Sequence, residues 1–116
     1  MFQLIYRSTS CLPGSGDDLE RGVTEIISQS FPKNQRNGVT GILLHADGLF
    51  FQLLEGPTDQ IESTMCYITR DTRHKDVQII SETTIDHYSL PYSPIACAGL
   101  GEALPLAVSD ALVNTE

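Results

Sequence analysis

The sequence lacks the features that mark several large classes of protein. Its 116 residues contain no apolar run near the roughly 18 residues of a transmembrane helix, and its N-terminus lacks the basic and apolar segments of a secretory signal. Only seven Lys and Arg stand against fifteen Asp and Glu, which gives a formal net charge of −8. Because nucleic acids and anionic membranes bind basic faces, we expect neither as a partner.

Metal-binding and nucleophilic motifs are also absent from the sequence. The three cysteines are odd in number and widely spaced, so we expect free thiols in a reducing cytoplasm. They do not combine with the three histidines into a zinc-ligand spacing. No phosphate-binding glycine loop and no Ser-His-acid or Cys-His pattern stands out. The sequence therefore predicts no metal site and no enzyme of these classes.

What the sequence does contain is one globular domain built around a strong hairpin signal. Hydrophobic residues make up 41% and charged residues 19%, which is ordinary for such a domain. Asp47-Gly48 is a two-residue turn signal between two runs rich in leucine, aromatic and β-branched residues. With that turn, Leu43 faces Gln52 and His45 faces Phe50, and residues that face each other share one side of the sheet.

Gln52 is the unusual member of this hairpin, because it places a primary amide among leucines and a phenylalanine. A buried amide without partners is costly, so Gln52 is expected to meet polar groups. A strand predicted over residues 2–8 puts Tyr6 on the same face as Leu4. If that face also meets the helices, two readings are open: a core tyrosine bonded to a core glutamine, or a polar pair around a buried ligand.

The chain alternates strands and helices in the order β-α-β-β-α-β-β. The elements outside the hairpin are expected at residues 2–8, 17–30, 57–71, 77–85 and 93–100. Pro32 is expected to end the first helix. This order predicts an α+β fold with both helices on one face of a mixed sheet, in a domain over residues 1–98 followed by a tail or linker over residues 99–116.

The sheet face away from the helices is also expected to be apolar. Alternation along the hairpin places four large side chains there: Ile42, Leu44, Phe51 and Leu53. Such a face needs a cover, which the C-terminal tail, a second copy of the chain or a downstream domain would provide. Self-association through this outer face is therefore expected.

The few basic residues gather after the two predicted helices. Lys33 and Arg36 follow the first helix, and Arg70, Arg73 and Lys75 follow the second. Cations favour helix C-termini because of the helix dipole, which is one reading. The other is that both clusters flank a cleft between the helices and bind a phosphate-bearing ligand.

Four motifs, taken together and in this order, resemble the BLUF domain, the blue-light sensor that uses FAD. They are Leu4-Ile-Tyr-Arg-Ser8, Asn34-x-x-Asn-Gly-Val-Thr-Gly-Ile-Leu-Leu44, Gly48-Leu-Phe-Phe-Gln-Leu-Leu-Glu-Gly56 and Arg70-Asp-x-Arg-His74. The resemblance covers about residues 2–85. It implies a ferredoxin-like fold with noncovalent FAD, or FMN, between the two helices, in a cytoplasmic photoreceptor that is not an enzyme.

The resemblance also implies how light acts on the protein. Tyr6 matches the photoactive tyrosine and Gln52 the switching glutamine. A neutral phenol, with an ordinary pKa of about 10, is no base at pH 7, but it can give an excited flavin an electron and then a proton. Glutamine has a donor and an acceptor end, so its rotation or tautomerisation rearranges hydrogen bonds. The strand with Gln52 would pass this change to a partner or effector.

Five other residues match the flavin pocket of the family. Asn34 matches the asparagine that bonds the flavin carbonyl and ring N–H edge, and Ser30 matches a polar pocket residue at the end of the first helix. Arg73 matches an arginine near the ribityl-phosphate end of the flavin. His74 is its neighbour, and Lys33 falls at a position that lies beside the ring in relatives.

The chain departs from the family pattern in its last strand, where relatives often carry a W-x-M pattern. It has no tryptophan, and Ser93 and Ile95 stand at these two positions. The properties that this departure affects are recovery of the dark state, the orientation of Gln52 and the path of signal output. Two other functions also fit the residues. One is a BLUF-like dimerisation or partner-binding module without photochemistry, and the other is a small flavin- or nucleotide-dependent enzyme.

Overall fold

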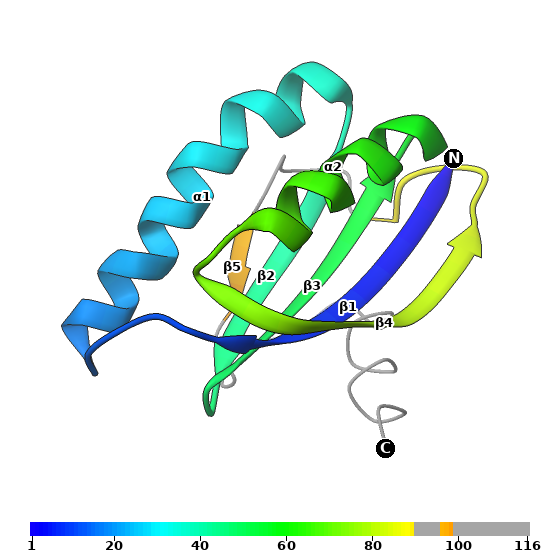
Figure 1. Ribbon diagram of the computed structural model, residues 1–116. Coiled ribbons are helices and arrows are strands. Elements are labelled where there is room, and N and C mark those ends of the chain that lie inside the picture. The colour runs from blue at the N-terminus through cyan, green and yellow to red at the C-terminus, as the bar shows by residue number, and fades with distance from the viewer. Residues whose placement is uncertain (90–95, 99–116) are drawn as a thin grey trace.

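The computed structural model describes residues 1–89 and 96–98, which form a sheet with two helices on one of its faces (Figure 1). Its elements are β1 (Phe2–Ser10), α1 (Asp17–Asn37), β2 (Thr40–Ala46), β3 (Leu49–Gly56), α2 (Thr58–Arg70), β4 (His74–Thr84) and β5 (Ala96–Ala98). The strand order is β4-β1-β3-β2-β5, and every neighbouring pair is antiparallel except β2–β5. The predicted ferredoxin-like α+β fold with a mixed sheet is confirmed.

The hairpin between β2 and β3 has the predicted turn and register. Asp47 and Gly48 have φ values of 54° and 76°, as a two-residue turn that follows the strand twist requires. Leu43 pairs with Gln52 and His45 with Phe50. Because a slip of one residue would exchange the two faces, this turn fixes which side chains face the helices.

Helix α1 continues seven residues beyond the predicted end at residue 30 and closes at Asn37. The prediction that Pro32 ends it is wrong. Proline removes one backbone donor and costs about 3 kcal/mol inside a helix, yet it does not prohibit the next turn. Here the helix ends at Gly38, whose φ of 69° and backbone N–H cap the carbonyls of the last turn. Asn34 therefore lies within α1 and not after it.

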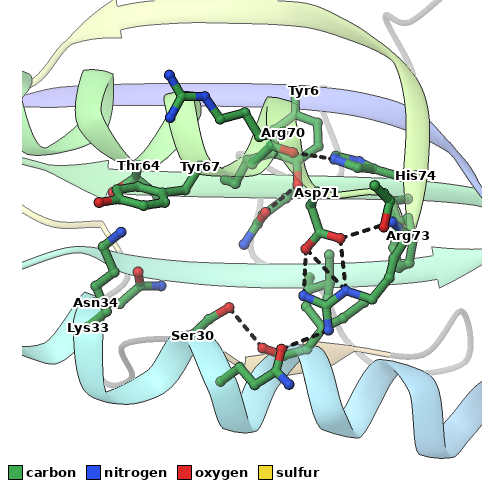
Figure 2. Close-up of a pocket in the computed structure, with 17 residues that line it drawn as sticks. Tyr6, Ser30, Lys33, Asn34, Thr64, Tyr67, Arg70, Asp71, Arg73 and His74 are labelled. Atoms are coloured by element: carbon green, nitrogen blue, oxygen red, sulfur yellow. Dashed lines mark hydrogen bonds and ion pairs between the residues drawn. The ribbon is translucent and has the colours of Figure 1, made fainter.

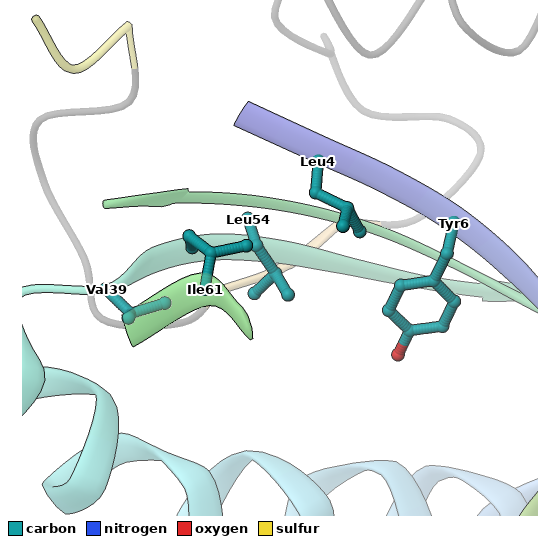
Figure 3. Packing of buried hydrophobic residues seen from close by; sticks show 5 residues of the cluster. All are labelled: Leu4, Tyr6, Val39, Leu54 and Ile61. Atoms are coloured by element: carbon teal, nitrogen blue, oxygen red, sulfur yellow. The ribbon is translucent and has the colours of Figure 1, made fainter. Parts of the chain in front are cut away.

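The core on the helix side consists of two clusters, one under each helix. In the first, Ile61 of α2 packs with Leu4, Tyr6, Val39 and Leu54, and Figure 3 shows these five residues together. In the second, Val23 of α1 packs with Leu43 and Phe50 of the sheet. The apolar stripe of α1 thus packs against the sheet, as its 3.6-residue period predicts. A cavity remains between the two clusters.

The opposite face of the sheet is apolar and its centre is buried. Leu44 and Leu53 are each 1% exposed, and Ile42 and Phe51 are partly buried. The predicted edge strand is present at Ala96–Ala98, where it pairs in parallel with β2.

Two further expectations fall outside the described residues. These are the positions Ser93 and Ile95 of the family's W-x-M pattern and the tail at residues 99–116. Within the described part of the chain, neither helix is long and apolar enough to cross a membrane.

Candidate functional site

A cavity of about 560 Å³ lies between α1, α2 and the helix-side face of the sheet. This volume is within the range of roughly 300–1,000 Å³ usual for small-molecule sites. All seven residues that the sequence assigned to a flavin site line it: Tyr6, Ser30, Lys33, Asn34, Gln52, Arg73 and His74. They come from β1, α1, β3, the turn after α2 and the start of β4, and only the fold brings them together (Figure 2).

Tyr6 and Gln52 form the innermost polar pair of the cavity. They lie opposite each other in the β1–β3 register, and the Tyr6 hydroxyl donates a hydrogen bond of 2.5 Å to Gln52 Oε1. The two residues are only 3% and 6% exposed. Burial, with a smaller contribution from the carboxylate of Asp71, raises the pKa of Tyr6 well above its ordinary value. The phenol therefore keeps its proton at any physiological pH.

The other end of the Gln52 amide is available to a ligand. Among residues 1–89, no acceptor bonds to Gln52 Nε2. Gly41 on β2 borders this group, since a Cβ there would lie 3.8 Å from Gln52 Nε2 and 3.0 Å from the carbonyl of Leu53. Gln52 Nε2 is not among the buried, unpaired side-chain atoms of the described residues, and Gln52 lines the cavity, so its two donors face the cavity, where a ligand or water can accept from them. This observation favours a ligand with acceptor atoms on its edge.

His74 supports the pair from the side. Its Nε2 lies 2.5 Å from the carbonyl oxygen of Ile68, which can only accept, so Nε2 carries the proton. The Ser8 hydroxyl then donates to His74 Nδ1 over 2.7 Å. The imidazole meets the rings of Tyr6 and Phe50 edge-on, with centroids 6.2 Å apart in each case. His74 therefore joins the end of α2 to the strand with Tyr6.

Arg73 lies at one end of the cavity and ties its two sides together. Its guanidinium donates to both carboxylate oxygens of Asp71, at 2.9 and 2.5 Å, and to Gln29 of α1 at 2.8 Å. The hydrogen bonds from Arg73 hold the pKa of Asp71 below its ordinary value. The guanidinium is thus held at the cavity rim by an ion pair with Asp71 and a hydrogen bond to Gln29.

The residues at the other end of the cavity come from both helices (Figure 2). Lys33 of α1 places its ammonium over the ring of Tyr67 of α2. Asn34 is 5% exposed and lies beside it in the last turns of α1. Ser30 donates to the carbonyl of Ile26, 2.8 Å away, and keeps its oxygen lone pairs for other donors.

Sequence reasoning missed several residues that line the cavity or hold it in shape. They are Ser8, Gln29, Thr64, Tyr67 and Asp71. Strand alternation carried a signal for Ser8, since it places this residue two positions from Tyr6 on the same face. Asp71 carried a signal too, because it lies within the motif that contains Arg73 and His74. The α2 residues gave none, since only the distance between helices shows that they meet α1.

The site has an apolar floor of Ile26, Leu43 and Phe50, a polar pair at its inner wall and a guanidinium at its rim. This arrangement fits a planar ring with acceptor and donor atoms on one edge and an anionic group at the other end, which is the chemistry of a flavin nucleotide. The protein is thus an α+β ligand-binding domain with a built flavin-type site.

The family model "BLUF: Sensors of blue-light using FAD" matches residues 1–92, and the chain belongs to this family. It is 37% identical over 86 residues to photoactivated adenylate cyclase subunit alpha of Euglena gracilis, which covers 74% of this chain and 8% of that protein. It is 38% identical over 74 residues to the blue light- and temperature-regulated antirepressor BluF of Escherichia coli, which covers 64% of this chain and 17% of that one.

Solved structures agree with this assignment. The dark-state structure of the BLUF protein BlrB has a TM-score of 0.81 and 26% identity, over 97% of this chain and 83% of that one. A bacterial light-regulated adenylyl cyclase has a TM-score of 0.73 and 30% identity, over 99% of this chain and 33% of that one.

As a BLUF domain, the chain is a blue-light-sensing module of signal transduction that binds a flavin, FAD by the family's description. It spans less than a fifth of the length of the two relatives named above.

Proposed function

We propose that this chain is a non-enzymatic photoreceptor domain in which Tyr6 and Gln52 are the photoactive pair. The observation that carries the proposal is the 2.5 Å hydrogen bond from the Tyr6 hydroxyl to Gln52 Oε1 at the inner wall of the cavity. A bound flavin would supply the blue-light absorption and would accept the electron and the proton that Tyr6 gives up. The Tyr6 hydroxyl points this proton at Gln52 Oε1.

Gln52 then stores the result as a changed hydrogen-bond pattern. Once the phenol no longer donates to Oε1, rotation or tautomerisation of the amide exchanges donor and acceptor ends without moving the backbone. Burial of both side chains supports this role, because water cannot compete for their hydrogen bonds. Asn34, Ser30 and Lys33 hold the flavin from the side of α1.

Other parts of the proposal concern the chain as a whole. We assign the sensor to residues 1–98 and a tail or linker to residues 99–116, with output to a protein partner or effector. We also propose self-association through the outer sheet face. Its partly buried residues Ile42 and Phe51 would make this contact, because Leu44 and Leu53 are already buried within one chain. The free thiols of Cys11 and Cys66 support a reducing, cytoplasmic location.

An absorption spectrum of the purified chain tests the proposal. We expect the structured blue band of a bound flavin and a small, reversible red shift of this band under blue light. A chain that stays colourless after reconstitution with FAD would instead be a partner-binding module. A coloured chain that converts a substrate and shows no red shift would be a flavin enzyme.

The raised pKa of Tyr6 leads to a prediction on pH. Because burial keeps the phenol protonated, the size of the red shift is expected to stay constant between about pH 6 and pH 9. The stability that neutral Tyr6 contributes is present below the ordinary tyrosine pKa of about 10 and is lost only as the pH rises beyond it. Spectra recorded across this range check the prediction, and a titration of the red shift near neutral pH would contradict it.

Arg73 is expected to discriminate between flavins by their phosphate groups. Arg73→Ala removes a charge-assisted donor, so affinity for FMN and FAD should fall by about 10- to 100-fold while affinity for riboflavin changes little. Arg36→Ala is the matched control, because Arg36 lies in the last turn of α1 and does not line the cavity. Equal losses for riboflavin and FMN in Arg73→Ala, measured by fluorescence titration, would show that Arg73 does not bind phosphate.

A further inference from the structure

A second polar pair joins the two strands that carry Tyr6 and Gln52. Gln3 lies opposite Glu55 in the β1–β3 register, three residues along the strands from the first pair. Gln3 Nε2 donates a hydrogen bond of 2.7 Å to Glu55 Oε2. Because side chains alternate along a strand, this offset puts the second pair on the sheet face away from the cavity. The same two strands therefore carry one polar pair on each face.

Glu55 is fully buried, which is unusual for a carboxylate. Ser89, in the segment that follows β4, is another of its partners. The backbone N–H of Ser89 donates to Glu55 Oε1 over 2.8 Å, and the Ser89 hydroxyl donates to Oε2. A buried carboxylate is tolerated only when donors satisfy it, so Ser89 and Glu55 stabilise each other in place.

Residues 88 and 89, which follow β4, are anchored to two other parts of the fold. Ser89 donates a hydrogen bond to Glu55 of β3. The Tyr88 hydroxyl donates over 2.7 Å to the carbonyl of Gly38. Gly38 is the C-cap of α1, and its backbone N–H donates to the carbonyl of Asn34. Both anchors are thus on elements that also build the cavity.

We propose that Gln3, Glu55, Tyr88 and Ser89 form a clasp, here termed the Glu55 clasp, that transmits the state of the cavity to the segment after β4. The inference rests on the proposed function of Tyr6 and Gln52. When the hydrogen bond between Tyr6 and Gln52 changes, β3 shifts against β1. The same shift alters the hydrogen bond between Gln3 and Glu55 on the other face of the sheet. Both hydrogen bonds from Ser89 end on one carboxylate and depend on its orientation, so a small rotation weakens both. Illumination then releases Ser89 from Glu55.

Amide hydrogen exchange tests the Glu55 clasp on the full 116-residue chain loaded with FAD, with the absorption spectrum recorded on the same sample. In the dark, the amide of Ser89 is expected to be protected. Under blue light it should exchange about tenfold faster or more, which is the effect of losing a hydrogen bond to a charged group. A red shift with unchanged exchange at Ser89 would overturn the clasp alone. No red shift at all would overturn the photoactive pair, and the clasp with it.

Two mild variants test the anchors separately. Ser89→Ala removes only the hydroxyl bond to Glu55, and Tyr88→Phe removes only the bond to Gly38. Each should keep the flavin band and the red shift, expose the amide of residue 89 already in the dark and thereby shrink its response to light. Ser63→Ala, an exposed serine of α2, is the matched control and should behave as the wild type.

The anchors are refuted if both variants keep the wild-type protection at residue 89 in the dark and the wild-type change in light. Glu55→Gln keeps the shape of the side chain but not its charge, and its exchange should resemble that of Ser89→Ala. Because Glu55 is buried, this third variant also tests stability: a lower melting temperature without flavin is expected, whereas Ser63→Ala should leave the melting temperature unchanged.

Discussion

Tyr6→Phe is expected to keep the flavin band and to abolish the light-induced red shift. Phenylalanine retains the ring that packs with Leu4, Leu54 and Ile61, so the fold and the cavity wall stay intact. What is lost is the O–H group that donates to Gln52 Oε1, and with it the proton that the proposed reaction moves. Loss of this hydrogen bond should also lower the free energy of unfolding by about 0.5–1.5 kcal/mol.

Tyr88→Phe is the matched control for this prediction. It removes the same atom from a tyrosine whose hydroxyl is also hydrogen-bonded, to Gly38, but which lies outside the cavity. Both variants are measured by absorption before and after blue light, together with chemical denaturation. A red shift of wild-type size in Tyr6→Phe would remove this residue from the mechanism. Loss of the red shift in both variants would mean that the effect is not specific to the cavity.

The sequence predicted most of what local rules control. The Asp47-Gly48 turn determines which residues of β2 and β3 face each other, and the two-residue period of a strand then puts Gln52 on the helix side. The alternation of side chains along β1 places Tyr6 on the helix side as well. The pairing of these two side chains needed only one further fact, namely that β1 and β3 are neighbours. The predicted ferredoxin-like fold makes these two strands neighbours.

The features that sequence reasoning missed depend on contacts between distant segments. Helix α1 continues past Pro32 because Gly38 caps its last turn and Asn34 is buried there. The helix propensities of single residues describe neither the cap nor the burial. Glu55 is fully buried, and Ser89, 34 residues further along the chain, donates a hydrogen bond to it. No periodicity in the chain indicates that contact.

Gln52→Leu is the second variant with a large expected effect, since it removes the group that is proposed to switch. Leucine fills a similar volume among Leu43 and Phe50, but it leaves the buried Tyr6 hydroxyl without its acceptor. An unpaired buried hydroxyl costs about 1–3 kcal/mol, so the free energy of unfolding should fall by that amount in the absence of flavin. Flavin affinity should fall by roughly tenfold, because the two donors of Gln52 Nε2 are also lost.

The red shift should disappear in Gln52→Leu even when added FAD saturates the site, because no amide remains to exchange its donor and acceptor ends. Gln78→Leu is the matched control: it makes the same substitution on β4, where the exposed glutamine bonds Arg7 and does not line the cavity. Flavin titration gives the affinity, and spectra of the saturated protein in dark and light give the shift. A saturated Gln52→Leu protein that still shifts would mean that light changes another hydrogen bond to the flavin. Asn34 would then be the first residue to test, because it lines the same cavity from α1.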